Sequence, residues 1–440
     1  AAPNMTGAIT LIKQAHPGLT SEELKTLAMN TAKILPNAPV TLQGAGRVQI
    51  DQALLAPVLV QPAKLSLGQI ELQDTARVSK TLTVKNITAN EVTLSIETAV
   101  TPGLAIAVQS QVTVPAGGSA QVPVEVTLSM VAPDKLLLEM EGRVIFRQGA
   151  RIAAQVPALA MRTQASQILS PQTSVGGGVA FTNTSPNDGL ALAFNLLGED
   201  GRKSAASSVD AWKSTACDLQ SAGYRVIQRA TPQGVIDYIQ FAVKVYAANT
   251  SWLGCEVSVL IDGDEDGIAD QELAGAAGGA LEGVGPAQFA SLLLDAHKAR
   301  QIRLSYEIGL AAGIEGKLNY APALIDASGM APFPNSSIAL IEGRLDKLMR
   351  SADGKLNIKI AALNVLGDAV EADDYLGSGL VGFGKLSPLP AEHPYYGMSE
   401  YSVVSKAAGG AATMSKGSGT GKLILYYPFN PMDAQYQVLD

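Results

Sequence analysis

The chain has 440 residues, which is enough for two or three domains of ordinary size. Hydrophobic residues make up 47% and charged residues 16%, and 40 acidic against 32 basic residues give a net charge of −8. Without basic runs, this balance argues against a nucleic-acid partner, because phosphate neutralisation requires clustered lysine and arginine. No apolar run reaches the roughly 18 residues that a membrane helix needs.

The first 57 residues carry helical signals. Pro3 suits the first turn of a helix that continues to about Ala15. Thr20, with Glu23 three positions later, predicts a capping box at the start of a second helix. Apolar residues then recur at helical spacing, namely Leu24, Leu27 and Ala28. We therefore predict a helical segment over residues 1–57.

Near residue 57 the hydrophobic period changes from helical spacing to alternation. Apolar and polar residues alternate in several runs, including Leu82 and Val84, Val92 to Ile96, and Val122 to Leu128. Alternation of this kind is typical of half-buried antiparallel strands. Residues 58–163 are thus predicted to form one β-sandwich of immunoglobulin or fibronectin type III shape.

Residues 164–440 are predicted to form a further β-rich, sandwich-like accessory domain. Ile239, Phe241, Val243 and Val245 share one face of a strand, with Gln240 and Lys244 on the other face. Further strands are expected at Val257–Ile261 and Lys422–Tyr427, and one helix at Pro286–Arg300.

An acidic loop follows the strand Val257–Ile261. Six of the eleven residues from 262 to 272 are acidic, with no lysine or arginine among them. The expected calcium ligands are the side chains of Asp262, Asp264, Asp266, Asp270 and Glu272, with the backbone carbonyl of Ile268. Oxygen donors without nearby His or Cys favour calcium, as a structural cofactor, over zinc. The alternative is a solvated acidic turn. The loop is not a standard EF-hand, because Leu273 stands at the twelfth position counted from Asp262, where an EF-hand has glutamate.

The two cysteines, Cys217 and Cys255, are too few for a disulfide scaffold or a thiolate zinc site. A single disulfide between them is one interpretation, and two buried free thiols are the other.

The residues offer little for catalysis within this chain. The three histidines are His16, His297 and His393, and no Gly-Xaa-Ser-Xaa-Gly elbow lies between a strand and a helix. The glycines of 377–382 match a dinucleotide-binding pattern formally, but without a βαβ context we interpret them as a loop.

The opening residues carry a family resemblance. Ala1-Ala2-Pro3 with Gly7, then Leu11–Pro17, Asn30-Thr31-Ala32 and Gly44–Val48, follow one another in the order of the sequence behind the serine motif of subtilases. The chain resembles the C-terminal portion of a subtilase (peptidase family S8), with Asn4 where many members have His. The resemblance implies that the nucleophile lies two residues before Ala1 and that no triad member is present here.

The resemblance also sets expectations for the whole chain. It implies a mainly β protein with an N-terminal helical remnant: 1–57 from the subtilase domain, 58–163 resembling a fibronectin III-like domain, and 164–440 an accessory domain. The parent would be a secreted or cell-surface bacterial endopeptidase acting on proteins or peptides, with the upstream catalytic domain as partner. The alternative is a non-catalytic calcium-binding surface or adhesion module. Residues 1–57 are expected to be removable without unfolding the β-domains.

Overall fold

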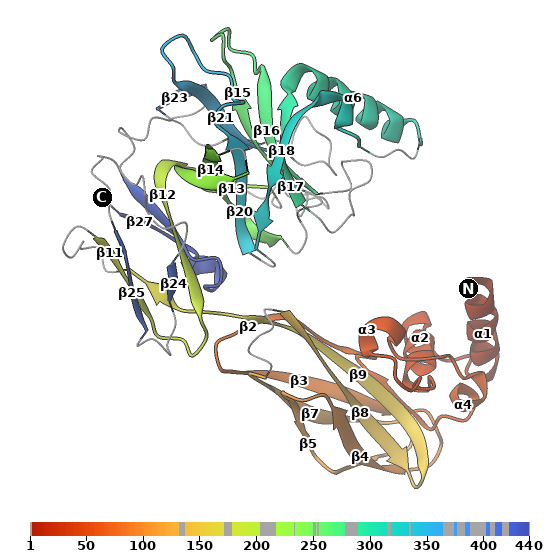
Figure 1. Ribbon diagram of the computed structural model, residues 1–440. Coiled ribbons are helices and arrows are strands. Elements are labelled where there is room, and N and C mark those ends of the chain that lie inside the picture. Colours follow the sequence, from red (N-terminus) through yellow and green to blue (C-terminus); the bar gives the residue numbers. More distant parts are fainter. Residues whose placement is uncertain are drawn as a thin grey trace. The chain divides into compact units, whose positions relative to one another are not determined.

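The computed structural model describes residues 2–131, 137–170, 178–202, 217–232, 234–249, 252, 255–277, 289–314, 318–333, 336–363, 374–375, 383–387, 402–404, 410–415 and 422–439. The chain divides into two compact units, Ala1–Ala165 and Ser166–Asp440 (Figure 1). The described chain is mostly strand, with a helical N-terminal segment, which confirms the predicted fold class. No described helix is both long and apolar enough to cross a membrane.

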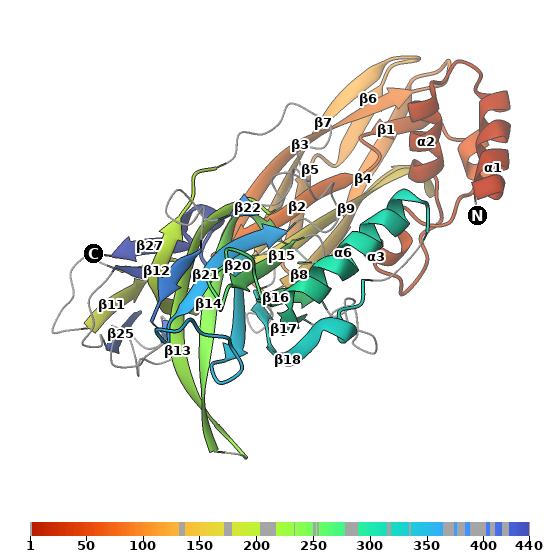
Figure 2. The same cartoon turned by 90° about the horizontal axis from the view of Figure 1, so that it is seen from above.

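The first unit opens with four helices, which lie together at one end of it (Figure 1). Figure 2 shows the first two of them at that end from above. The four helices are α1 (Ala2–Ala15), α2 (Ser21–Asn30), α3 (Val40–Gln43) and α4 (Ile50–Leu54). The predicted capping box is present at α2: the Glu23 N–H donates to the Thr20 side chain, and the Thr20 N–H donates to the Glu23 carboxylate. Behind this cap, Leu24, Leu27 and Ala28 are buried, as their spacing predicts.

Two sheets form the sandwich of the first unit. Their strands are β1 (Val58–Gln61), β2 (Leu65–Leu72), β3 (Thr75–Asn86), β4 (Val92–Val100), β5 (Leu104–Val108), β6 (Gln111–Val114), β7 (Ser119–Ser129), β8 (Leu137–Gln148) and β9 (Arg151–Gln164). One sheet has the order β1-β3-β7-β5 and the other β2-β9-β8-β4-β6. The alternating apolar residues of β3, β4 and β7 point into one common core, as expected.

The helices pack on this sandwich through buried polar side chains. Asn30 is fully buried, donates to the Gln155 carbonyl at 3.1 Å and accepts from the Val60 N–H at 2.7 Å. Gln155 on β9 donates in turn to the carbonyls of Ala32 and Ala45. The segment therefore packs on the sandwich within one compact unit, and its removal would expose the surface of β1 and β9 that it covers. That residues 1–57 can be removed without unfolding the β-domains stays a prediction.

The described part of the second unit contains three sheets. Its strands are β10 (Ile168–Leu169), β11 (Gly178–Asn183), β12 (Gly189–Glu199), β13 (Leu219–Thr231), β14 (Gly234–Asn249), β15 (Glu256–Ile261), β16 (Gln271–Ala277), β17 (Phe289–Asp295), β18 (Leu324–Gly329), β19 (Ala331–Pro332), β20 (Ser336–Arg344), β21 (Leu356–Leu363), β22 (Asp374–Tyr375), β23 (Gly384–Leu386), β24 (Ser402–Val404), β25 (Ala411–Ser415), β26 (Leu423–Tyr426) and β27 (Tyr436–Leu439). The largest sheet has the order β19-β20-β14-β13-β12-β26-β27, with β24 beside β12. The next has the order β18-β17-β16-β15-β21-β22, with β23 beside β21, and β10-β11-β25 form the third.

The two large sheets share one hydrophobic core. Ile239, Phe241, Val243 and Val245 of β14 contribute to it from one sheet, and Val257, Val259 and Ile261 of β15 from the other. The opposite face of β14 is buried as well, because Gln240 is 6% and Lys244 1% exposed. The sequence placed these two polar residues on the correct face but did not show that this face is covered.

The segment predicted as one helix over Pro286–Arg300 is a strand followed by a helix. Within the described part, β17 spans Phe289–Asp295 and α6 spans Ala296–Ala311. Leu292 to Leu294 pair with β16 on one side and β18 on the other, so sheet pairing overrides the helical pattern. The late strand is confirmed as β26.

We predict that Asn30→Ala destabilises the first unit by roughly 1–3 kcal/mol, because it leaves the Val60 N–H buried without an acceptor. Differential scanning calorimetry measures the effect. Both tryptophans, Trp212 and Trp252, belong to the second unit by sequence, so a parallel fluorescence melt assigns its transition. Asn4→Ala, on the exposed side of α1, is the matched control. Equal melting curves for both variants would contradict the packing described.

Candidate metal centre

The acidic loop connects β15 to β16 in the second unit. Its ends are held by the strands: the Asp262 N–H donates to the Asn357 carbonyl at 3.0 Å, and the Asp270 N–H to the Ile261 carbonyl at 2.8 Å. Between them the chain turns through positive φ angles at Glu265 (64°) and Gly267 (87°). The glycine adopts this conformation at no steric cost, which allows the chain to turn sharply here.

Three aspartates of the loop converge. Carboxylate oxygens of Asp262, Asp264 and Asp270 all lie within 4.8 Å of one another. Like charges at this separation repel, and the repulsion is strongest where a group is buried, as Asp262 is at 1% exposure. A cation among the three carboxylates would remove this repulsion.

Asp262 supplies a second and separate indication of a ligand. Its Oδ2 accepts from the Gly267 N–H at 3.0 Å and from the Asn357 side chain at 3.2 Å. Its Oδ1 is buried and has no hydrogen-bond partner within the described part of the chain. An unsatisfied buried carboxylate oxygen costs free energy unless a ligand meets it, and here it belongs to the group that the other two aspartates face.

The backbone of the loop positions the other two carboxylates. Asp270 Oδ2 accepts from the N–H groups of Gly263 (2.8 Å) and Asp264 (3.4 Å). Asp264 Oδ1 accepts from the Asp266 N–H at 3.2 Å. These bonds hold the aspartates in place and leave one oxygen of each outside them.

Asp266, another expected ligand, lies outside the converging group of carboxylates. It is exposed, and its Oδ1 accepts from the Ile268 N–H at 2.7 Å, so it stabilises the turn. Ile268 is 52% exposed, and the role of its backbone carbonyl as a ligand stays a prediction. Glu265 is exposed and pairs with Lys385 at 2.7 Å.

Glu272 does not belong to this site, which corrects the predicted ligand set. It lies on β16, is fully buried, and forms an ion pair with Arg303 of α6. Its Oε1 also accepts from Ser258 Oγ at 2.7 Å. The carboxylate is therefore satisfied away from the loop, and Arg303, 31 residues further along the chain, is the partner that sequence spacing does not indicate.

Arg303 serves a second buried carboxylate, Glu256, at 3.0 Å. The Tyr320 hydroxyl donates to Glu256 and accepts from Arg303. Burial raises the pKa of Glu256 to about 7, the charge of Glu272 adds to that rise, and Arg303 opposes it. Two carboxylates thus share one guanidinium in the interior, and burial disfavours the ionised form of Glu256.

Cys217 and Cys255 are joined by a disulfide, with their Cα atoms 5.4 Å apart. Both are buried in the core shared by the two large sheets. The bond ties the segment before β13 to the start of β15, the strand that leads to the acidic loop.

The N-terminal segment matches known proteins. Residues 1–46 match the profile of the subtilase family. Over 169 residues the chain is 32% identical to the "Minor extracellular protease Vpr" of Bacillus subtilis (strain 168), covering 36% of this chain and 20% of that protein. The first 46 residues of this chain are thus similar to subtilase sequence. The chain spans a fifth of the length of this relative.

Similarities to solved structures are weak. The CupB2 chaperone of Pseudomonas aeruginosa is 11% identical, with 43% of this chain and 93% of that chain covered, at a TM-score of 0.17. The secreted serine protease VesC of Vibrio cholerae is 11% identical, with 47% and 36% covered, at a TM-score of 0.18. The account of the fold rests on the strand pairing described above.

Within the segment similar to subtilases, His16 follows the end of α1, and its Nε2 is buried without a partner in the described structure. His297 lies on α6 of the other unit. His393 and the glycines of 377–382 lie outside the described residues. The described histidines thus form no pair with a serine that would support nucleophilic catalysis.

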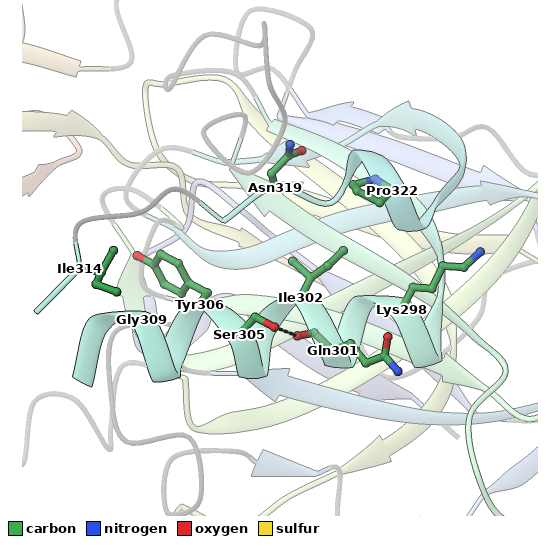
Figure 3. A pocket seen from close by; sticks show the side chains of 9 residues that line it. All are labelled: Lys298, Gln301, Ile302, Ser305, Tyr306, Gly309, Ile314, Asn319 and Pro322. Atoms are coloured by element: carbon green, nitrogen blue, oxygen red, sulfur yellow. Dashed lines mark hydrogen bonds between the residues drawn. The ribbon is translucent and has the colours of Figure 1, made fainter. Parts of the chain in front are cut away.

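A shallow pocket of about 520 Å³ lies along α6 (Figure 3). Ile302, Tyr306 and Ile314 give it an apolar lining. The hydroxyl of Ser305, the serine of this lining, donates to the Gln301 carbonyl at 2.8 Å. Lys298, the lysine of the lining, pairs with Asp295 at 3.2 Å. The lining contains no nucleophile with a base beside it, so the acidic loop is the better functional candidate.

We predict that the second unit loses stability as the pH rises through about 7. Folding raises the pKa of Glu256 above its ordinary value, so this contribution is fully present below about pH 4.5 and is lost as the carboxyl ionises in the interior. Tryptophan fluorescence melts in a chelator, from pH 4.5 to 8, measure the effect. Glu256→Gln should flatten this dependence and melt above the wild type at pH 8.

The matched control is Glu307→Gln, an exposed glutamate on the same helix as Arg303. It should reproduce the wild-type pH dependence. A Glu256→Gln variant with the pH profile of the wild type would refute the assignment of this titration to Glu256.

Proposed function

We propose that this chain is the accessory, C-terminal part of a secreted bacterial subtilisin-like serine endopeptidase. The observation that supports this is the subtilase sequence of residues 1–46 together with the extracellular protease related to the chain. The serine, histidine and aspartate of the subtilase domain would hydrolyse peptide bonds of protein or peptide substrates through an acyl-enzyme. The β-units would stabilise that domain or hold substrate.

Contacts within the first unit support the proposed stabilising role. Arg143 on β8 donates to the carbonyls of Gly44 and Ala45, and Arg151 on β9 donates to those of Gln52 and Leu55. Glu23 of α2 pairs with Lys85 of β3 at 2.5 Å. Polar contacts from three strands thus reach the helical segment along its length, so the sandwich supports the subtilase helices directly.

We further propose that the second unit binds one structural calcium ion at Asp262, Asp264 and Asp270. The single observation that carries this is the buried, unpartnered Oδ1 of Asp262 beside the other two carboxylates. Three carboxylates supply hard oxygen ligands, and calcium completes its six to eight ligands with carbonyls and water. No His belongs to the group, and both cysteines are in the disulfide, which disfavours zinc.

Calcium would organise more than the loop itself. The Ala296 N–H, at the first residue of α6, donates to the Asp270 carbonyl at 2.9 Å. A bound ion therefore fixes both the β15–β16 turn and the point at which α6 begins.

Calcium is expected to raise the melting temperature of the second unit by mass action, equivalent to about 2.7 kcal/mol at a hundredfold excess over Kd. Fluorescence melts with calcium and with a chelator measure the shift. Asp264→Ala should abolish it, whereas Asp266→Ala, which removes an equal charge from the same loop but lies outside the converging group, should retain it. Equal melting temperatures in calcium and chelator, with no metal by elemental analysis, would refute the site.

We expect the purified chain to cleave no casein, and the longer protein that includes the complete subtilase domain to cleave it. A serine-directed inhibitor should block the longer protein. Truncation of that protein at residue 165 should retain activity at 25 °C but shorten its half-life on heating, if the second unit stabilises the enzyme. A longer protein without inhibitor-sensitive activity would instead favour the non-catalytic calcium-binding surface or adhesion module.

A further inference from the structure

Three polar side chains from distant parts of the second unit meet in its interior. They are Lys244 of β14, Ser337 of β20 and Gln435, which directly precedes β27. Their exposures are 1%, 0% and 1%. Neither the acidic loop nor the subtilase segment explains why a lysine and an amide are buried here.

The three groups form a chain of short contacts. Lys244 Nζ donates to Ser337 Oγ at 2.8 Å, and Ser337 Oγ donates to Gln435 Oε1 at 2.6 Å. The amide orientation is fixed, because Gln435 Nε2 donates to the carbonyls of Asn430 (3.0 Å) and Pro428 (3.3 Å). A serine hydroxyl is thereby held against the carbonyl of a carboxamide, with an amine on its other side.

Lys244 is suited to accept a proton. Within the described structure it forms no salt bridge, and its other hydrogen bond is to the Val245 carbonyl at 3.3 Å. Burial lowers the pKa of its ammonium to about 8, and the charge of Asp433 limits the fall. A substantial fraction of the amine is then neutral near physiological pH, which an exposed lysine is not.

The carbonyl oxygen of Gln435 has further donors. The Ser337 N–H lies 3.3 Å from Oε1 and the Ser336 hydroxyl 3.4 Å. Donors aimed at this oxygen would stabilise the negative charge that develops on it during attack at the carbonyl carbon.

We propose that Ser337 and Gln435 become joined by an intramolecular ester bond. Ser337 Oγ attacks Cδ of Gln435 while Lys244 Nζ takes the hydroxyl proton. The tetrahedral intermediate then collapses, the Cδ–Nε2 bond breaks, and Lys244 returns the proton to the leaving nitrogen, which departs as ammonia. One C–O bond forms, one C–N bond breaks, and no oxidant or reductant is needed.

The fold favours this reaction and preserves its product. Held at contact distance, the two groups react with the advantage of an intramolecular process. Their burial excludes the water that would hydrolyse the ester. The link would tie β20 to the start of β27 across 98 residues of sequence and restrict the unfolded chain accordingly.

Intact-mass spectrometry of the denatured full chain tests the proposal. The wild type is expected to weigh less than its sequence by the mass of one ammonia molecule. Peptide mapping should localise the loss to a linked pair of peptides containing residues 337 and 435, and hydroxylamine should cleave the link. Ser337→Ala and Lys244→Met should restore the full mass, whereas Ser305→Ala, which removes an exposed hydroxyl on α6, should retain the loss.

Two results would overturn the proposal. A wild-type chain at its full sequence mass would show that the contact is a hydrogen bond alone. A loss of ammonia that persists in Ser337→Ala but disappears in Lys244→Met, with a hydroxylamine-resistant link, would assign the bond to Lys244 and not to Ser337. Neither result depends on calcium or on the protease, so the test stands apart from the proposed function.

Discussion

Strand β15 carries a buried carboxylate at each end. The organisation of its sheet depends on which groups bind these two carboxylates. Glu256 begins the strand and is met by Arg303 and Tyr320. Asp262 follows its last residue and is only half satisfied by hydrogen bonds. Because β15 lies between β16 and β21 in the sheet, neither charge can reach bulk water without loss of strand pairing. An arginine thus pairs with the carboxylate at one end, and the other end is the site of the proposed calcium ion.

This constraint accounts for the position of α6. The helix begins at a residue hydrogen-bonded to Asp270, at the acidic end, and its side chain Arg303 enters the sheet at the opposite end. A single helix thus spans both charged positions of the strand. Apolar contacts alone would not supply a partner for either carboxylate. The packing of α6 is therefore specified by charge as well as by hydrophobic burial.

The sequence predicted what local patterns encode. Alternation located the strands of the sandwich, the Thr20–Glu23 pair located a helix start, and short motifs located the segment that is similar to subtilases. It failed where distant residues decide the outcome. Glu272 has the spacing of a loop ligand, but Arg303 takes it. Phe289–Asp295 has a helix-compatible apolar run, but two neighbouring strands pair with it. The cover over Gln240 and Lys244 comes from other strands and leaves no mark in the local pattern.

Buried polar groups are where the two units make their specific connections. In the first unit, Gln155 and Arg143 join the sandwich to the helices, and each is satisfied by backbone carbonyls that only the folded helical segment presents. In the second unit, Asp262 and Lys244 are buried with fewer partners than their charges require. Groups of the first kind stabilise one arrangement of the chain. Asp262 and Lys244 instead have atoms available to coordinate an ion or to transfer a proton. Chemistry beyond folding is therefore best sought at these two residues.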